Sequence, residues 1–440
     1  MKAVIVAGGK GTRMAKLGAV IPKALIPIAG KPLIAYQIEN LKRHGLRDVL
    51  LIINHLGEQI KKYCGNGRRF GVKITYYEEQ KPLGTAGAIK LLEKKLKNDF
   101  IVIYGDVLIN VDFTRLIKQH NRNKLTAKNL AGTLVLHPND HPFDSDLVEA
   151  DENGRITRFI SKPHRAGFYF RNLVNAGLYV LTPRIHRFIP KNKAADFGKH
   201  IFPRVLEQNG ALFAYNTPEY LKDMGTPKRR REVEIAVRSG KFKRSNLSHK
   251  RPAIFMDRDG VINEEVGDIR RIEDFKLIPN SAKAIKLINQ HNYFAVVISN
   301  QPQVAKGFCR YEDILEFHKK METLIAEGEG AKLDAIYFCP HHPDKGFPGE
   351  NKKYKIICEC RKPKTGLARR AIRDLNIALK NSVMIGDSTR DAKLAENLGI
   401  RFIGVKTGEG VRDGIYKLKA KPKVYKNLLA AVRVIGLPKS

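Results

Sequence analysis

The stretch Ile254-Phe-Met-Asp-Arg-Asp-Gly-Val-Ile-Asn263 decides the fold of the C-terminal half of this 440-residue chain. Apolar, strand-forming residues run directly into Asp257 and Asp259, and Gly260 then ends the strand. The two carboxylates are therefore expected at the carboxyl end of a buried strand, where open α/β sheets bind their ligands. Because Asp257 and Asp259 are two residues apart, they point to the same side of the pleat. In that position they can share a magnesium ion and a phosphate group.

Three further motifs follow this stretch along the chain. They are Ser299-Asn300 after the apolar run Phe294–Ile298, then Lys362, and finally Gly386-Asp387 after Val383–Ile385. Their order resembles that of the haloacid-dehalogenase-like phosphatases and includes all of the catalytic motifs of that family. A surface Asp-x-Asp turn is the alternative explanation of the first stretch, and the three later motifs argue against it.

The resemblance to these phosphatases implies a role for each residue. Asp257 would attack phosphorus and form an aspartyl phosphate. Asp259 would protonate the leaving alkoxide and then activate water. The other implied roles are phosphoryl binding by Ser299 and the Asn300 amide, charge compensation by Lys362, and magnesium coordination by Asp257, Asp387 and the carbonyl of Asp259. Asp391, one helical turn after Asp387, would orient the magnesium ligands.

Sulfur and nitrogen ligands stand in two short motifs of the same half, Cys339-Pro-His341 and Cys358-Glu-Cys360. Three thiolates and one imidazole suit a tetrahedral zinc ion, and a filled ligand shell indicates a structural site. Unligated thiols in a surface loop are the alternative. The loop runs into Arg361-Lys362-Pro363, as in the D-glycero-D-manno-heptose 1,7-bisphosphate phosphatases, which it resembles, and histidinol-phosphate phosphatases share it. This resemblance implies that Arg361 is a second cation for a substrate with two phosphates.

The N-terminal half opens with Val4-Ile-Val-Ala-Gly-Gly-Lys-Gly-Thr-Arg-Met14, a strand that leads into a glycine-rich turn. Backbone N–H groups in such a turn can hold phosphates. The turn is not a P-loop, because its lysine is not followed by Ser or Thr. Five motifs follow it in order: Pro22–Pro27, Pro82–Gly87, Tyr104–Asp106, Asn175–Gly177 and Asp223–Pro227. Together they resemble the sugar-1-phosphate nucleotidyltransferases over residues 1–235, most closely the guanylyltransferases of mannose-like or heptose 1-phosphates.

This second resemblance implies a substrate site that depends on positioning and charge neutralisation. Asp106 and Asp223 would hold magnesium, and Arg13 and Lys23 would neutralise the triphosphate and the sugar phosphate. The implied substrate-binding residues are Gly8, Gly9 and Gly11 in the turn, Gly84, Thr85 and Gly87 in the nucleoside pocket, Asn175, and Lys162 at the sugar phosphate. Ser161 departs from the family pattern, because many relatives carry glutamate before that lysine.

Strand-like runs alternate with amphipathic segments such as Pro32–His44 in both halves, which predicts parallel, doubly wound sheets. We therefore predict two α/β domains. Residues 1–240 would form a GT-A-like (Rossmann-like) nucleotidyltransferase domain. Residues 253–435 would form a haloacid-dehalogenase-like domain with the zinc loop. The polar and basic residues 241–252 would be an irregular linker.

The formal net charge of +36 is spread over both halves. No helix-turn-helix, RNP or zinc-finger pattern accompanies it, so we expect phosphorylated small molecules rather than nucleic acid as partners. No apolar stretch approaches the roughly 20 residues of a membrane span, and Met1 leads into a strand rather than a signal peptide. The five cysteines, an odd number, fit a reducing compartment, and we expect a cytoplasmic protein.

These observations predict a bifunctional enzyme of activated-heptose synthesis. The phosphatase half would remove the 7-phosphate of a heptose 1,7-bisphosphate, and the transferase half would join the resulting 1-phosphate to a nucleotide, GMP from GTP. One alternative is a mannose-1-phosphate guanylyltransferase fused to a histidinol-phosphate-type phosphatase. Another is a basic regulatory or nucleic-acid-binding protein with inactive enzyme domains. The sequence leaves open the nucleobase, the sugar, its anomer, the oligomeric state and direct transfer between the sites.

Overall fold

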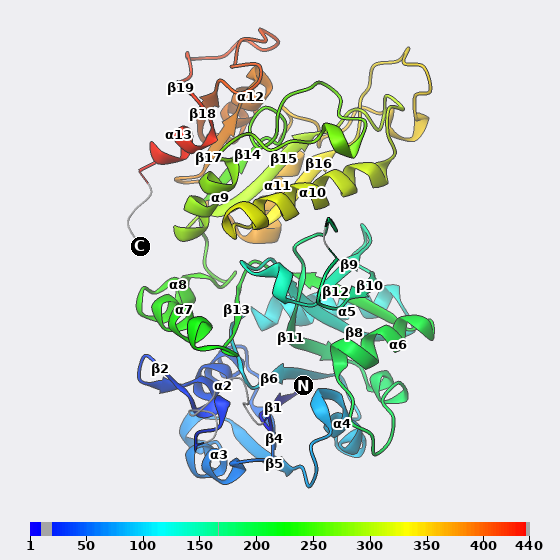
Figure 1. Cartoon of the computed structure of the whole chain (residues 1–440), viewed down its shortest axis with the longest axis vertical. Coiled ribbons are helices and arrows are strands. Elements are labelled where there is room, and N and C mark those ends of the chain that lie inside the picture. The colour runs from blue at the N-terminus through cyan, green and yellow to red at the C-terminus, as the bar shows by residue number, and fades with distance from the viewer. Residues whose placement is uncertain (10–19, 166, 437–440) are drawn as a thin grey trace. The chain divides into compact units, whose positions relative to one another are not determined.

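The computed structural model describes residues 1–9, 20–165 and 167–436. The chain forms two compact units (Figure 1). The first unit comprises Met1–His137, Phe143–His164 and Leu173–Leu247, and the second comprises Pro138–Pro142, Arg165–Asn172 and Ser248–Ser440. None of the helices in the described ranges combines the length and the apolar character that a membrane crossing needs.

A nine-stranded mixed sheet forms the centre of the first unit. Its strands are β1 (Lys2–Val6), β4 (Asp48–Ile53), β5 (Lys73–Glu78), β6 (Phe100–Tyr104), β8 (Leu130–His137), β9 (Leu147–Ala150), β10 (Ile156–Ile160), β11 (Val174–Leu181) and β12 (Ala211–Asn216). Strand β1 pairs in parallel with β4 and β6, and β11 runs antiparallel to β6, β8 and β9. Two short antiparallel pairs accompany the sheet: β2 (Pro27–Ile28) with β3 (Lys31–Pro32), and β7 (Val107–Asn110) with β13 (Tyr220–Asp223).

Helices cover both faces of this sheet, which explains why β1 is apolar at successive positions. Ala3 and Ile5 pack in one core with α2 (Leu33–Arg43), α3 (Gly57–Cys64) and α5 (Phe113–Thr126). Val4 points to the opposite face and packs with α4 (Gly84–Leu91) and α6 (Phe202–Glu207). Adjacent strand residues face opposite sides, so both sides of β1 must be apolar. The prediction of a doubly wound α/β architecture is confirmed, but the prediction of a parallel sheet is wrong for this unit, because β11 runs antiparallel to β6, β8 and β9.

The segment after α7 (Pro227–Arg238) differs from the irregular linker predicted for residues 241–252. Residues Lys241–Arg244 form the short helix α8, and Phe242 packs edge-on against the ring of Tyr36 at a centroid distance of 5.5 Å. The N–H of Leu247 donates to a carboxylate oxygen of Glu219 at 2.8 Å, and the first unit ends at Leu247. A single apolar residue among lysines and arginines gives no periodicity, so its burial could not be inferred from the local pattern.

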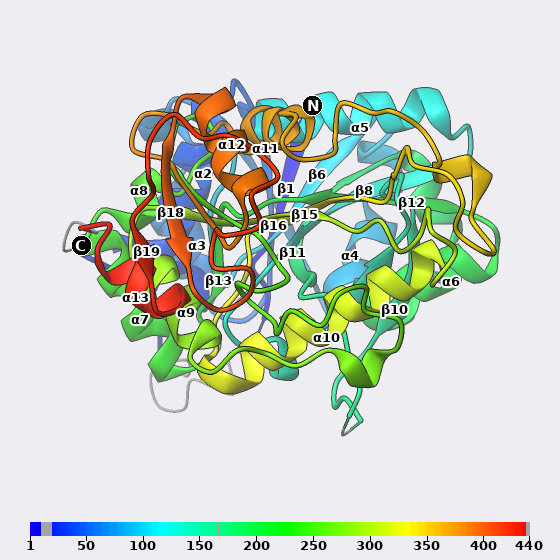
Figure 2. The same ribbon diagram turned by 90° about the horizontal axis from the view of Figure 1, so that it is seen from above.

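The second unit contains a fully parallel six-stranded sheet in the order β16-β15-β14-β17-β18-β19. The strands are β14 (Ala253–Met256), β15 (Phe294–Asn300), β16 (Ala335–Cys339), β17 (Val383–Gly386), β18 (Arg401–Val405) and β19 (Val424–Tyr425). The helices are α9 (Ser281–Gln290), α10 (Tyr311–Glu329), α11 (Gly366–Leu375), α12 (Thr389–Leu398) and α13 (Leu428–Arg433). Figure 2 shows α11 and α12 on one face of the sheet and α9, α10 and α13 on the other.

Strand β14 lies at the centre of this sheet, between β15 and β17. Parallel strands end at the same edge, so the residues that follow these three strands meet there. Asp257 and Asp387, which follow β14 and β17, and Ser299, near the end of β15, are brought together in this way. The strand order is thus what assembles the predicted phosphatase residues from distant parts of the chain.

Candidate functional site

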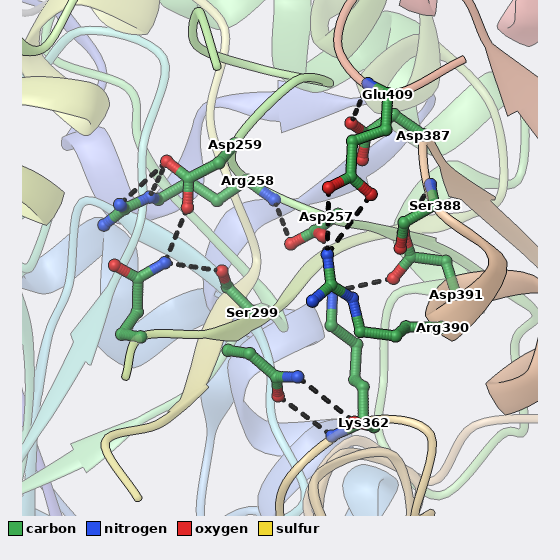
Figure 3. A network of polar contacts seen from close by, with 12 residues as sticks. Asp257, Arg258, Asp259, Ser299, Lys362, Asp387, Ser388, Arg390, Asp391 and Glu409 are labelled. Atoms are coloured by element: carbon green, nitrogen blue, oxygen red, sulfur yellow. Dashed lines mark hydrogen bonds and ion pairs between the residues drawn. The ribbon is translucent and has the colours of Figure 1, made fainter. Parts of the chain in front are cut away.

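Lys362 is the centre of the polar cluster at the carboxyl edge of the second sheet (Figure 3). Its Nζ lies 2.6 Å from Oδ2 of Asp257 and 2.7 Å from Oδ1 of Asp391. The ammonium group is almost fully buried. Burial disfavours its charge, but the two carboxylates outweigh this effect and raise the pKa of Lys362. The lysine therefore stays a cation next to Asp257.

The carboxylates of Asp257, Asp387 and Asp391 lie close enough together to share one metal ion. Burial and then the neighbouring carboxylates raise the pKa of Asp387 to about 8. Burial raises the pKa of Asp257 to about 6, although Lys362 opposes the shift. Such crowding of buried negative charge is relieved by a cation, and three hard oxygen donors suit Mg²⁺. Asp391, expected only to orient the ligands, is a full member of this group.

Asp259 is held by four N–H donors on its two carboxylate oxygens. Arg258 donates to Oδ1 from Nε at 3.1 Å and from Nη2 at 2.8 Å, and Asn263 donates to the same oxygen at 2.9 Å. Gln301 donates to Oδ2 at 2.7 Å. In Figure 3 this carboxylate points toward the Arg258 guanidinium, whereas that of Asp257 points toward Lys362. The side chain of Asp259 therefore does not belong to the three-carboxylate group. Coordination of magnesium by the main-chain carbonyl of Asp259 stays a prediction.

Ser299 and Asn300 end β15 beside these aspartates. Oγ of Ser299 accepts a hydrogen bond from Nε2 of Gln301 at 2.7 Å. The side chain of Asn300 accepts from the main-chain N–H of Lys362 at 2.9 Å and donates to its carbonyl at 3.2 Å. The Asn300 side chain thus fixes the backbone that carries Lys362. The contact between the Asn300 amide and a phosphoryl oxygen stays a prediction.

A cavity of about 320 Å³ opens in front of Asp257. Its wall carries four positively charged side chains, those of Lys306, Arg361, Lys362 and Arg390. Arg361 is anchored by a hydrogen bond of 3.2 Å from Nη1 to the carbonyl of His341. Arg390 pairs with Glu409 at 3.2 Å, and the N–H of Glu409 donates to Oδ2 of Asp387 at 2.8 Å. The same wall carries the carboxylates of Asp257, Asp259, Glu265, Asp268, Asp387 and Glu409. An anionic substrate in this cavity would therefore depend on these cations, together with a bound metal ion, to offset the negative charge.

Cys339, His341, Cys358 and Cys360 converge in the second unit. The Sγ atom of Cys360 lies 3.1 Å from that of Cys339 and 3.2 Å from that of Cys358, and Nδ1 of His341 lies 3.2 Å from Sγ of Cys360. Cys339 is the last residue of β16, so the sheet fixes one end of the cluster. Three sulfurs and one nitrogen at these separations fit one tetrahedral soft-metal ion.

In the first unit, Lys23 and the two predicted metal-binding aspartates lie together. Nζ of Lys23 contacts Oδ2 of Asp106 at 3.1 Å. Asp223 pairs with Val107 in the β13–β7 ladder, and the N–H of Met224 donates to the carbonyl of Asp106 at 2.9 Å. Asp106 and Asp223 are therefore neighbours in space although they are 117 positions apart in the chain. Gly11 and Arg13 lie outside the described residues.

A chain of ion pairs continues from Asp223. Nη1 of Arg229 donates to Oδ1 and Oδ2 of Asp223, both at 2.9 Å, and Nη2 of Arg229 contacts Asp144. Nζ of Lys162 lies 3.0 Å from Oδ1 of Asp144. The sequence analysis predicted Lys162 and Asp223 as site residues but missed Arg229 and Asp144. Arg229 belongs to a run of three arginines, which in sequence looks like an exposed helix face.

The predicted nucleoside-pocket residues have close packing partners. A Cβ atom on Gly84, whose φ is +74°, would lie 2.6 Å from the carbonyl oxygen of Ala195. A Cβ atom on Gly87 would lie 3.0 Å from the carbonyl oxygen of Lys193. Oγ1 of Thr85 donates to Asp196 at 2.8 Å. These residues therefore hold α4 against the segment before α6. This packing explains why glycine and threonine occur at these positions, in addition to the binding role predicted for them.

Two other predicted residues of the first unit are also placed. A Cβ atom on Gly8 would lie 2.8 Å from a carboxylate oxygen of Glu79, whereas one on Gly9 would meet none of the described residues within 4 Å. Asn175 lies in β11, and its Oδ1 accepts a hydrogen bond from the Tyr179 hydroxyl at 2.9 Å. Among the residues that sequence analysis missed, Gln301 directly follows the Ser299-Asn300 motif, and that adjacency is the only sequence signal for it.

Comparison with known proteins gives a separate match for each half. The family model for nucleotidyl transferases matches residues 2–239, and a HAD-hydrolase-like model matches residues 359–431. The D-glycero-D-manno-heptose-1,7-bisphosphate 7-phosphatase of Thermosynechococcus vestitus is 40% identical over 190 residues, which cover 42% of this chain and 95% of that protein.

The mannose-1-phosphate guanyltransferase of Candida albicans is 35% identical over 237 residues, or 52% of this chain, and the chain spans only 62% of that protein's length. The structure of HddC from Yersinia pseudotuberculosis complexed with GMP-PN has 25% identity and a TM-score of 0.45, over 54% of this chain and 99% of that one.

Proposed function

Because the chain belongs to the nucleotidyl transferase family through its first half and to the heptose-bisphosphate-phosphatase-like haloacid dehalogenases through its second, we propose that it is a bifunctional enzyme of activated-heptose synthesis. The phosphatase site would remove the 7-phosphate of D-glycero-D-manno-heptose 1,7-bisphosphate. The transferase site would then join the heptose 1-phosphate to GMP from GTP. The proposed substrates of both sites are soluble phosphates, and we expect the enzyme to act in the cytoplasm.

One observation carries this proposal. The cavity in front of Asp257 has cations on its wall in addition to Lys362, the lysine that pairs with Asp257. A monophosphate needs only the cation at the reacting phosphoryl group. The further charge of Arg361 suits a substrate with a second, remote phosphate, whereas Lys306 is already paired with Asp268 at 2.8 Å. A heptose bisphosphate has this charge distribution, whereas histidinol phosphate has one phosphate and a cationic amine.

In the proposed phosphatase reaction, a carboxylate oxygen of Asp257 forms a bond to phosphorus as the bond between phosphorus and the sugar oxygen breaks. Asp259 gives a proton to the leaving alkoxide and then takes one from the water that hydrolyses the aspartyl phosphate. Lys362 offsets negative charge at the phosphoryl group. Arg258 and Gln301 keep Asp259 in place through these steps, since both donate to its carboxylate.

In the proposed transferase reaction, an oxygen of the sugar 1-phosphate attacks the α-phosphorus of the nucleoside triphosphate and pyrophosphate leaves. Such a reaction depends on positioning and on charge neutralisation. Lys23 lies beside Asp106, where it can neutralise a phosphate. Lys162, which pairs with Asp144, would bind the sugar phosphate.

Two kinds of metal ion complete the proposal. The oxygen donors of Asp106 and Asp223, and those of Asp257, Asp387 and Asp391, suit Mg²⁺, which would neutralise phosphate charge at each site. The set formed by Cys339, His341, Cys358 and Cys360 suits Zn²⁺ with a structural role.

A second sugar deserves a test, because the transferase half is similar to mannose-1-phosphate guanyltransferases. Mannose 1-phosphate shares the phosphate and the ring but lacks the additional carbon of the heptose. We propose heptose as the substrate because the product of the phosphatase site is then the substrate of the transferase site. Rates with heptose 1-phosphate and mannose 1-phosphate, each with GTP, ATP, CTP and UTP, would separate the two possibilities.

The coupled reaction is the direct experiment. Purified protein supplied with heptose 1,7-bisphosphate, GTP and Mg²⁺ should produce a GDP-heptose without any added enzyme. The products are followed by mass spectrometry and by release of phosphate and pyrophosphate. Formation of free heptose 7-phosphate as the first product, or absence of a nucleotide sugar, would contradict the pathway.

The Arg361→Ala variant tests the role of the remote phosphate. A contact lowers the barrier only if it is also made in the transition state. We expect kcat/KM for the bisphosphate to fall about 10-fold to 100-fold, as for loss of a charge-assisted hydrogen bond, while turnover of a small monophosphate changes little. Equal losses on both substrates would instead place Arg361 at the reacting phosphoryl group.

A further inference from the structure

The guanidinium of Arg229 is hydrogen-bonded to the carboxylate of Asp223, a predicted metal ligand. Its Nη1 group donates to both oxygens of Asp223 at 2.9 Å, and its side chain is only 12% exposed. Arg229 lies in the first turn of α7, where its main-chain N–H is capped by Oγ1 of Thr226 at 3.3 Å. The cap and the two hydrogen bonds fix the guanidinium over Asp223.

A metal ion bound by Asp223 must use at least one of the same two oxygens. Asp106, the expected second ligand, is adjacent through the β13–β7 ladder and the hydrogen bond from Met224 to its carbonyl. Guanidinium does not lose its proton in proteins, so Arg229 cannot yield to the metal by becoming neutral. A carboxylate has enough lone pairs for both cations, but a metal ion and a guanidinium on the same two oxygens repel each other. Movement of Arg229 away from Asp223 would relieve this repulsion.

The second partner of Arg229 shows where the guanidinium can go. Its Nη2 contacts Asp144, whose Oδ1 also accepts a hydrogen bond from Nζ of Lys162 at 3.0 Å. The two cations therefore share one carboxylate. The side chain of Asp144 is 58% exposed, so an anion can reach this point from solvent. The planar donors of a guanidinium match two oxygens of a phosphate group.

We propose that Arg229 competes with the metal ion for Asp223 and, when displaced, binds the phosphate of the sugar 1-phosphate beside Lys162, with Asp144 positioning both cations. The proposal rests on the nucleotidyl transfer proposed above. It couples metal binding to the formation of the sugar-phosphate site, because the same guanidinium serves Asp223 or the substrate.

Binding of Mn²⁺ to the full-length protein tests the competition without any need for turnover. We would use the Asp387→Asn background to remove one of the carboxylates proposed to hold metal in the second unit, and measure free Mn²⁺ by electron paramagnetic resonance. Arg229→Gln should tighten Mn²⁺ binding about 2-fold to 5-fold, which corresponds to the free energy of a partly exposed ion pair. Arg231→Gln is the matched control, since Arg231 is exposed in the same helix, and it should leave the affinity unchanged.

Binding of the phosphate is measured by titration calorimetry with D-mannose 1-phosphate as the probe in the presence of Mg²⁺. Arg229→Gln should weaken binding about 10-fold or more, and Arg229→Lys should weaken it less because the charge is kept. A purely structural arginine would not change the two affinities in opposite directions. Thermal unfolding of each variant checks that it is folded.

The outcomes separate this inference from the proposed function. Unchanged or weaker Mn²⁺ binding by Arg229→Gln would overturn the competition, and unchanged mannose 1-phosphate binding would overturn the second role. If wild-type protein binds both probes as expected but transfers no nucleotidyl group, the proposed function fails and the role of Arg229 remains. If it transfers nucleotidyl groups and the variants match wild type, only the role of Arg229 fails.

Discussion

Gly84 is the residue at which the absence of a side chain matters most clearly in the first unit. Its φ of +74° is strained for any residue with a Cβ, and that Cβ would lie 2.6 Å from the carbonyl oxygen of Ala195. Gly84→Ala should lower the free energy of unfolding by about 2 kcal/mol or more, measured by urea titration. Gly9→Ala is the control, because a Cβ there meets no atom of the part of the chain that the structure describes within 4 Å. Equal effects of the two changes would contradict this explanation.

His318 gives a second residue-scale prediction, for pH dependence. It is buried in α10 with Phe338 against its ring, and among the described residues its Nε2 has no hydrogen-bond partner. Burial, and then the charge of Arg258, lower the pKa of His318 well below its usual value. In the unfolded chain, His318 therefore binds a proton near pH 6.5, whereas in the folded protein it stays neutral at that pH. Because the unfolded chain binds more protons below pH 6.5, the free energy of unfolding decreases as the pH falls below this value.

The measurement is the free energy of unfolding between pH 8 and pH 5. Below about pH 6.5, wild type should lose up to about 1.4 kcal/mol per pH unit through this residue, and His318→Leu should lack that component. His249→Gln, a change at an exposed histidine, should keep the wild-type profile. Parallel curves for wild type and His318→Leu would show that His318 is protonated in the folded state.

At the scale of an element, we expect the loop after β16 to depend on the proposed metal-ligand group of Cys339, His341, Cys358 and Cys360. Cys339 is anchored by the sheet, whereas Cys358 and Cys360 follow a long irregular segment with the exposed residues Ile356 and Ile357. A bound ion would supply the cross-link that the loop otherwise lacks. Purified protein should contain about one zinc ion per chain, as a closed four-ligand site requires.

Cys358→Ser should lose this zinc and destabilise the second unit by about 2 kcal/mol or more, measured by metal analysis and thermal unfolding. Cys309→Ser changes a cysteine that is not part of the ligand group, and it should retain the metal. Zinc-free protein with full stability would rule out a structural role for the site.

At the scale of the whole molecule, each unit has its own hydrophobic core. Loss of a carboxylate proposed to be catalytic in one unit should therefore leave the other unit active. Asp257→Asn should reduce phosphate release at least about 1,000-fold and spare nucleotidyl transfer, and Asp106→Ala should do the reverse. Phosphate and nucleotide-sugar assays on the same preparations test this. If either variant, still folded, loses both activities, the two sites are not independent.

The strands and their terminal motifs could be predicted from the sequence because both depend on local pattern. Apolar runs predicted β1, β14, β15 and β17, since a strand covered on both faces must be apolar along its length. Asp257, Asp387 and the four Cys and His residues that converge in the second unit could be singled out because their chemical type and spacing are visible in short segments. For the same reason α8 was missed, because Phe242 becomes apolar core only through contact with Tyr36, far away in the chain.

The sequence by itself determined two α/β units and the kinds of groups at each site, because local hydrophobicity and motif spacing carry that information. Only the tertiary structure decided which charges meet. The tertiary structure pairs Arg229 with Asp223 and Asp144. It also brings Arg258 and Gln301 to the carboxylate of Asp259, and Asp391 to the ammonium group of Lys362. Each depends on strand register, helix position and side-chain rotamer together. A charged residue has the same appearance in sequence whether it faces water or a buried carboxylate, so its partner is fixed only when the chain is folded.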